Sequence, residues 1–150
     1  MKKIFLFIFI ILNFASVSLA ENLKFKKITS LDKPWGSSFI SNDKIIITEK
    51  SGKIKIVNIL TGDVNEIKHN LNFLEYGQGG LLDILYKDNF IYISYTENRE
   101  NWKTSTSIAK AKLDKKNLLF KNIFQANPPI DSGYHFGSRL AIKDNYLFAS

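Results

Sequence analysis

The feature that most constrains the fold is a succession of short apolar runs, rich in β-branched and aromatic residues, separated by turn residues. The runs are Ile45–Thr48, Ile54–Val57, Phe90–Tyr95, Ser107–Leu113 and Tyr146–Ser150. Runs of this length and composition, bounded by Gly, Asp, Asn and Ser, are typical of antiparallel hairpins. The sequence therefore predicts an all-β protein, and the near-helical spacing within 64–74 is expected to give only a strand remnant and a loop.

A weak internal repeat suggests how these hairpins are organised. Asp43, Asp88 and Asp144 each stand in a polar turn that leads into an apolar run, at intervals of roughly 50 residues. Four short strands with their loops need about that length, which is the size of one blade of a β-propeller. We therefore expect two blades and the start of a third, with an ordinary antiparallel sandwich as the alternative.

The first twenty residues have the composition of an export signal. Lys2 and Lys3 precede the apolar run Ile4–Leu12, and Ser18-Leu19-Ala20 places small residues where a signal peptidase cleaves. The apolar run is shorter than the ~20 residues of a membrane-spanning helix. We expect residues 1–20 to be a signal peptide cleaved after Ala20, and residues 21–150 to be an exported, periplasmic domain without a stable membrane anchor.

Composition excludes several classes of protein. The chain has no cysteine, which rules out disulfides and thiolate metal sites. Its formal charge of +7 is spread along the sequence and includes two lysines of the signal, so it predicts a solvated surface and no nucleic-acid partner. The last residues form an apolar run with no turn after it, and we expect the chain to be part of a longer protein.

Two stretches differ from ordinary strands and turns. In Gly77–Asp83, three glycines surround Gln78, whose amide can donate to and accept from a polar ligand; a flexible loop is the alternative. In Ser132–Leu140, His135 lies between two aromatic residues, and an imidazole is the side chain best suited to take a proton from an alcohol at neutral pH. A structural histidine is the alternative, and Arg139 can either bind a carboxylate or form an ion pair within the fold.

Five blocks in order resemble the glucose/sorbosone dehydrogenase family, the soluble aldose sugar dehydrogenases that use pyrroloquinoline quinone (PQQ). The blocks are Leu31–Trp35, Ile47–Ile54, Gly77–Asp83, Ile91–Glu97 and His135–Leu140. The resemblance implies a six-bladed β-propeller, of which this chain covers about the first two to three blades. It departs from the family pattern at the short Tyr86–Phe90 turn and at Tyr134, where the family often has an acidic residue.

The resemblance also implies an activity. His135 matches the general base of the family and Gln78 matches a glutamine that contacts the quinone or the substrate. The enzyme would oxidise the anomeric carbon of an aldose to a lactone, pass a hydride to PQQ, and deliver the electrons to an external acceptor. Calcium would bind beside the quinone through ligands outside this chain, so no metal ligand is expected among these residues, and the chain alone is expected to be inactive.

Two other functions remain open at this stage, because one fold hosts many activities. A non-catalytic propeller would bind a glycan or a protein without taking up a quinone. A lactonase-type propeller would hydrolyse lactones without an electron acceptor, and it would need metal-binding carboxylates near the axis.

Overall fold

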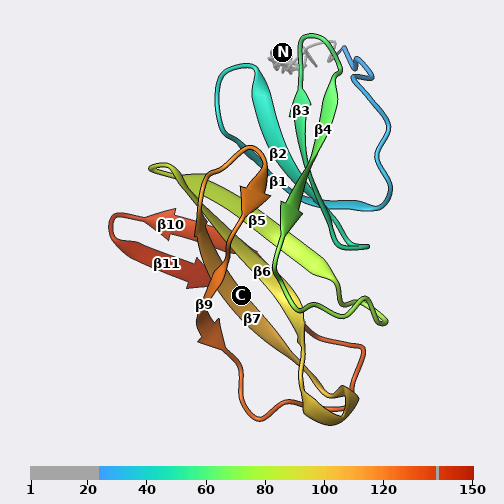
Figure 1. Cartoon of the computed structure of the whole chain (residues 1–150), viewed down its shortest axis with the longest axis vertical. Helices are drawn as coiled ribbons and strands as arrows, with labels where there is room; N and C mark the ends of the chain where they lie inside the picture. The colour runs from blue at the N-terminus through green and yellow to red at the C-terminus, as the bar shows by residue number, and fades with distance from the viewer. Residues whose placement is uncertain (1–23, 138) are drawn as a thin grey trace, which may run out of the picture.

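The computed structural model describes residues 24–137 and 139–150, so the expected signal peptide lies outside the described residues. The described chain is built almost entirely of β-strands, as the apolar runs predict (Figure 1). Its single short helical turn is η1 (Glu100–Trp102), which joins two strands. Among the described residues, no helix is long and apolar enough to cross a membrane.

The first blade is an antiparallel meander of four strands. They are β1 (Pro34–Phe39), β2 (Lys44–Glu49), β3 (Lys53–Asn58) and β4 (Val64–His69). They lie in sequence order, each hydrogen-bonded to the next. A fifth strand, β8 (Asn117–Leu118), pairs in parallel with the outer strand β4, so a segment from the second blade closes the edge of the first.

The second blade repeats the meander, and a third begins. The second blade consists of β5 (Leu81–Lys87), β6 (Phe90–Asn98), β7 (Thr104–Lys112) and β9 (Lys121–Gln125). A separate hairpin of β10 (Leu140–Lys143) and β11 (Tyr146–Ala149) follows. This arrangement agrees with the expectation of two blades and the start of a third.

The repeated Asp-Asn turns have a clear local explanation. In the β5–β6 hairpin, Lys87 pairs with Phe90, which leaves a loop of Asp88 and Asn89, both with positive φ (50° and 65°). Two such residues form the tight turn that matches the twist of a hairpin, and Asp and Asn tolerate this conformation better than other non-glycine residues. The β10–β11 hairpin has the same two-residue loop, Asp144 and Asn145, whereas Asp43 lies in a longer turn between β1 and β2. The repeat therefore marks the turn between the first two strands of each blade, with two forms of turn.

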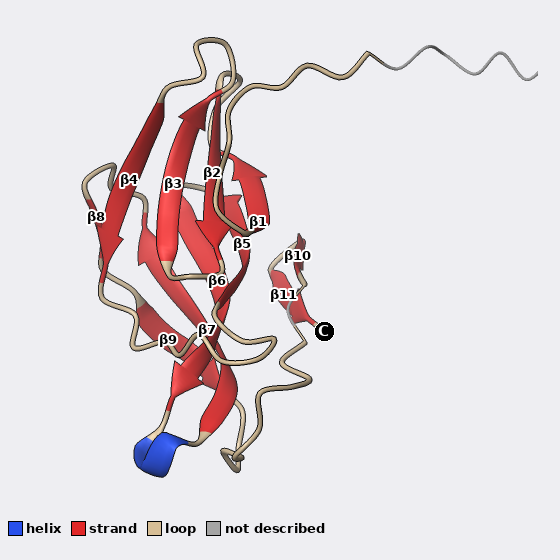
Figure 2. Ribbon diagram, turned by 90° about the vertical axis from the view of Figure 1, so that its right-hand side faces the viewer, coloured by secondary structure: helices blue, strands red, loops and turns tan. Residues whose placement is uncertain are grey.

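The two blades share one apolar core. Its members are buried side chains from both meanders: Ile46, Ile54, Ile56, Ile67, Leu81, Ile84, Ile91, Ile93, Tyr95, Ala109, Ala111, Leu118 and Phe120. The first strands β1, β5 and β10 lie close together, as Figure 2 shows. At Gly36 of β1 a Cβ atom would collide with the backbone of Asp83 in β5, so glycine is required for this approach. The Ser38 hydroxyl accepts a hydrogen bond from the Tyr86 N–H across the same junction (3.0 Å).

Candidate functional site

The structure brings the two predicted site residues into direct contact. The Gln78 Oε1 accepts a hydrogen bond from the backbone N–H of His135 at 3.1 Å, although the residues are 57 positions apart. The Gln78 N–H donates to the Gly133 carbonyl at 2.7 Å, so the two loops are joined by a second hydrogen bond. Both side chains are exposed. Gln78 and His135 thus form one small polar site between the segments that precede β5 and β10.

The backbone of His135 is held in an unusual conformation. Its φ is +63°, in the left-handed region that few non-glycine residues adopt and in which Asn, Asp and His are the most frequent of these. Such conformations cost free energy and persist where the surroundings impose them, often at functional sites. The His135 ring lies 6.4 Å from that of Tyr134, and it lines a cavity of about 120 Å³ beside the start of β7.

Hydrogen bonds from β7 fix the loop that carries His135. The Thr106 hydroxyl donates to the Phe136 carbonyl at 2.6 Å, and the Thr104 hydroxyl donates to the Ser132 carbonyl at 2.8 Å. Since each such bond contributes about 1 kcal/mol of net stability, the loop is anchored on both sides of the histidine. Phe136 itself is buried.

The glycines around Gln78 serve close packing within the protein. Gly77 (φ +59°) lies against the backbone of Gly133, and Gly80 (φ +147°) lies against the carbonyl of Lys50. At both positions a Cβ atom would collide with backbone. The Lys50 ammonium also donates to the Gly77 carbonyl. Backbone contacts on both sides therefore hold this segment.

Asp83 ends the glycine-rich stretch, and the sequence did not indicate a role for it. Its carboxylate is buried, and its Oδ2 accepts the Leu140 N–H at 2.7 Å. Its Oδ1 receives the Arg139 guanidinium at 3.4 Å, and the Arg139 side chain remains 76% exposed. Of the two roles left open for Arg139, the structure thus shows an ion pair within the fold. Asp83 ties the end of the His135 segment to β5.

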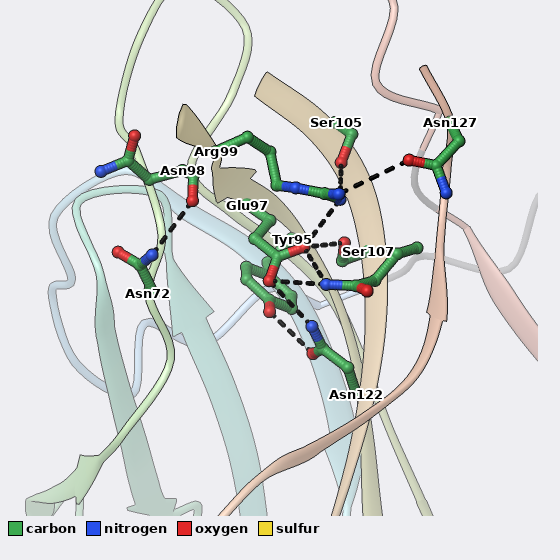
Figure 3. Close-up of polar contacts among 10 residues, drawn as sticks. Asn72, Tyr95, Glu97, Asn98, Arg99, Ser105, Ser107, Asn122 and Asn127 are labelled. Carbon is green, nitrogen blue, oxygen red and sulfur yellow. Dashed lines mark hydrogen bonds and ion pairs between the residues drawn. The ribbon is translucent and has the colours of Figure 1, made fainter. Parts of the chain in front are cut away.

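A buried carboxylate network lies at the end of β6, and the sequence did not indicate it. Glu97 accepts hydrogen bonds from the Ser107 hydroxyl (2.7 Å), from the amides of Asn122 (2.9 Å) and Gln125 (2.7 and 2.9 Å), and from the Arg99 guanidinium at 3.4 Å (Figure 3). The two amide donors, Asn122 and Gln125, lie 25 and 28 residues from Glu97 in the sequence, so no local motif predicts the network.

Arg99 extends the network of Glu97 toward the His135 loop. Its guanidinium donates to the Ser105 hydroxyl at 3.0 Å and to the Asn127 side-chain carbonyl at 3.5 Å (Figure 3). Asn127 stands at the start of the segment that leads from β9 to His135. The network therefore stabilises the same loop that β7 anchors through its threonines.

The second histidine of the chain has a structural role. His69 is partly buried, and both its ring nitrogens have partners. Nδ1 accepts the Leu71 N–H at 3.3 Å and Nε2 lies 2.7 Å from the Gly52 carbonyl. These contacts tie the His69 ring to the β2–β3 turn and to the segment after β4.

No cluster of three or more His, Asp or Glu residues suited to a metal ion occurs within the described part of the chain. The Gln78 amide hydrogens form no hydrogen bond to any residue of 24–137 or 139–150, so they remain able to donate to a ligand. The exposed amide and imidazole can form hydrogen bonds with a polar ligand.

The two four-stranded blades, the start of a third and the core shared by the first two are consistent with part of a β-propeller. The family model described as "Glucose / Sorbosone dehydrogenase" matches residues 31–150, and the chain belongs to this family. It is 30% identical to the aldose sugar dehydrogenase YliI of Escherichia coli (strain K12) over 128 residues, which are 79% of this chain and 34% of that protein. It is 31% identical over 139 residues to the uncharacterized protein slr1608 of Synechocystis, covering 82% of this chain and 33% of that one.

Solved structures give the same result for the fold. The crystal structure of the soluble aldose sugar dehydrogenase from Escherichia coli, in the apo-form, superposes with a TM-score of 0.69 at 25% identity over 75% of this chain and 35% of that one. The PQQ-bound aldose sugar dehydrogenase from Streptomyces coelicolor gives a TM-score of 0.64 at 22% identity over 75% and 35%. The chain spans about a third of the length of these relatives.

Proposed function

We propose that the full-length protein containing this chain is a PQQ-dependent dehydrogenase that oxidises the anomeric carbon of aldoses to lactones. The observation that carries the proposal is the contact between Gln78 and His135 at the point where the family motifs converge. The names of the relatives support the substrate class, since one is an aldose sugar dehydrogenase and another was solved with PQQ bound.

His135 acts as the general base. Its imidazole takes the proton from the C1 hydroxyl of the sugar, and the C1 hydride leaves as the C1–O bond becomes the lactone carbonyl. PQQ, when bound, supplies the electrophilic carbonyl that accepts this hydride. The strained backbone of His135 and the threonine hydrogen bonds hold the imidazole in place before the sugar arrives, so little order has to be created during the reaction.

Gln78 orients ligand and base together. Its Oε1 is engaged by the His135 N–H, which fixes the amide plane and leaves the amide hydrogens for a sugar or quinone oxygen. Calcium would polarise the quinone carbonyl as a Lewis acid, with ligands supplied by residues outside this chain. An external acceptor would take up the electrons, and the signal-like composition of residues 1–20 supports a periplasmic location for the reaction.

Reconstitution of the full-length protein tests this function. Apoprotein mixed with PQQ and calcium should change the quinone absorption spectrum and convert glucose to gluconolactone only when an electron acceptor such as a phenazine dye is present. No spectral change and no rise in melting temperature would indicate a non-catalytic propeller. Hydrolysis of gluconolactone without any acceptor would indicate a lactonase.

A further inference from the structure

One cation beside the candidate site has no carboxylate partner among the described residues. Lys50 lies in the turn between β2 and β3 of the first blade, and it is partly exposed. The ammonium of Lys55, in the same hairpin, pairs with the Glu49 carboxylate. The ammonium of Lys50 donates instead to the backbone carbonyl of Gly77. Its position is therefore set by the loop that carries the candidate site and by no ion pair.

The Gly77 carbonyl and the Gln78 N–H belong to one peptide group, and this group is held at both ends. Its oxygen accepts a hydrogen bond from the Lys50 ammonium, and its N–H donates to the Gly133 carbonyl at 2.7 Å. The carbonyl and the N–H of a planar trans peptide point in opposite directions. The group therefore bridges the first blade and the loop of His135. Since the Gln78 side chain starts from the next Cα atom, its direction depends on how this peptide is oriented.

We propose that Lys50 is a positioning residue: its ammonium fixes the peptide between Gly77 and Gln78, and through Gln78 it holds His135 in the geometry that the reaction needs. The inference rests on the proposed function, because it takes the Gln78–His135 pair as the place where the sugar is oxidised. It adds that the first blade, to which neither residue of the pair belongs, contributes to the site.

The charge of Lys50 strengthens the hydrogen bonds that follow it. A bond from a charged donor is about twice as strong as a bond between neutral groups. Hydrogen bonds in series also polarise one another, so a cation on the Gly77 oxygen strengthens the bond from the Gln78 N–H to Gly133. The Gln78 side chain adds the third bond, in which its Oε1 accepts the His135 N–H at 3.1 Å. Together the three bonds join the turn of the first blade to the loop of His135.

The backbone of Lys50 holds the other end of the same loop. Its carbonyl accepts the Leu81 N–H at 3.2 Å, and a Cβ atom at Gly80 would collide with this carbonyl. Its own N–H donates to the Lys33 carbonyl at 3.1 Å. The ammonium therefore reaches the Gly77 carbonyl from an anchored backbone. One residue thus fixes the loop on both sides of Gln78.

The bond between Lys50 and Gly77 is exposed to solvent, which separates positioning from overall stability. When the ammonium is removed, water can reach the Gly77 carbonyl, so no buried polar group is left without a partner. The backbone bonds of Lys50 are unaffected by a change of its side chain. We therefore expect a variant at this position to fold normally and to differ chiefly in how firmly Gln78 is oriented.

Glucose oxidation by the full-length protein loaded with quinone and calcium tests this role. For Lys50→Met we expect kcat to fall about tenfold, because proton removal depends on the placement of the base. Lys50→Arg keeps a charged donor and should recover kcat to within about threefold. Lys53→Met removes the same charge from an exposed position of the same hairpin and should leave kcat unchanged. Unchanged kcat in Lys50→Met, or an equal loss in Lys53→Met, would overturn the proposal.

A double-mutant cycle tests whether Lys50 acts through Gln78. Two residues that act through one contact have non-additive effects. In the Gln78→Ala background, Lys50→Met should lower kcat by less than a further factor of about two. An undiminished loss in that background would overturn the proposal. So would a weaker binding of quinone to Lys50→Met with unchanged kcat at saturating quinone, since it would assign Lys50 to cofactor binding.

Residue-resolved hydrogen exchange of the quinone-free, full-length protein separates this inference from the proposed function. The N–H groups of Gln78 and His135 should exchange about tenfold faster in Lys50→Met than in the wild type or in Lys53→Met, whether or not the protein oxidises sugars. Equal exchange in all three proteins would overturn the proposal. Absence of sugar oxidation by a quinone-loaded wild type would contradict the proposed function, while the exchange rates decide separately whether Lys50 holds the pair.

Discussion

The two blades carry the same Thr-Glu pair at the end of their second strand, and they stabilise its buried carboxylate by different means. Thr48 and Glu49 end β2, while Thr96 and Glu97 stand near the end of β6, and all four side chains are buried. In the first blade, Glu49 Oε1 pairs with the Lys55 ammonium at 2.7 Å and accepts the Asp32 N–H at 2.7 Å. Its Oε2 has no partner among the described residues.

The second blade replaces the ion pair with a set of mostly neutral donors. Lys55 lies opposite Ile47, and the residue in the equivalent register of the second blade, opposite Tyr95, is Ser107. Its hydroxyl donates to Glu97, which is also surrounded by two amides and Arg99. The difference shows that a buried carboxylate at this position can be stabilised either by an ammonium group or by several neutral hydrogen-bond donors. In the second blade these donors also link the strand to the loop of His135.

Replacement of Lys55 should have the largest effect on stability. Lys55→Met removes the cation and leaves the Glu49 charge buried with one backbone donor, which costs about 3–5 kcal/mol for a buried pair broken on one side. Chemical denaturation of the full-length protein measures this loss. Lys53→Met, at an exposed position on the same strand, is the matched control and should change stability by less than about 0.5 kcal/mol. An equally small loss for both variants would contradict the role of the ion pair.

The equivalent change in the second blade should be milder. Ser107→Ala leaves Glu97 with the amides of Asn122 and Gln125 and with Arg99, so we expect a loss of about 1 kcal/mol. The same denaturation experiment compares it with Lys55→Met. A loss as large as that of Lys55→Met would show that the remaining donors do not stabilise the Glu97 carboxylate.

Acid should affect the first blade through Glu49. Burial acts to raise the pKa of Glu49, but the hydrogen bonds from the Lys55 ammonium and the Asp32 N–H outweigh it and lower the pKa below the usual 4.5. A lowered folded-state pKa contributes stability above pH 4.5, and this contribution is lost as pH falls through the folded-state value. The stability difference between wild type and Glu49→Gln, followed by thermal unfolding, should therefore shrink below pH 4.5. A difference that stays constant down to pH 3 would contradict this assignment.

Alkali should affect the second blade through Tyr95. Burial, reinforced by the nearby Glu97 charge and opposed by the hydrogen bond to Asn122, raises the pKa of Tyr95 to about 12. Its contribution to stability is complete below the usual value of 10.0 and is lost as pH rises toward 12. Tyrosinate absorbance at 295 nm should show one phenol that titrates late and is missing in Tyr95→Phe. Identical titration curves would contradict this.

The strands that sequence reasoning found are those whose own residues favour strands. The β-branched run of β2 and the aromatic run of β6 fall where they were predicted, as do the Asp-Asn turns. The strand remnant expected within 64–74 is β4, which extends from Val64 to His69. The short parallel strand β8 has no local signal, because it exists only through its pairing with a distant β4.

The first strand of the first blade, β1, was missed for a different reason. β1 has the sequence Pro-Trp-Gly-Ser-Ser-Phe, with little β propensity, and it is a strand because it pairs with β2 and lies against β5. Gly36 and Ser38 are small where the two blades approach each other. Sequence patterns report local preference, whereas this strand is determined by packing between blades.

The candidate site shows the same difference between features set by local sequence and features set by long-range contacts. Gln78 and His135 were singled out because their settings differ from ordinary strand, and the structure adds that they touch. Asp83 and Glu97 were not assigned roles, because their partners lie 57 and up to 28 residues away. What could not be predicted is the set of long-range hydrogen bonds that hold the His135 loop.

The measurement that tests the central claim most directly is sugar turnover by His135→Ala in the full-length protein loaded with quinone and calcium. We expect quinone binding, followed by its absorption spectrum, to remain close to that of the wild type. Glucose oxidation should fall by about 10²–10⁴-fold, the usual contribution of a general base. Near-normal turnover in the quinone-loaded variant would contradict the account.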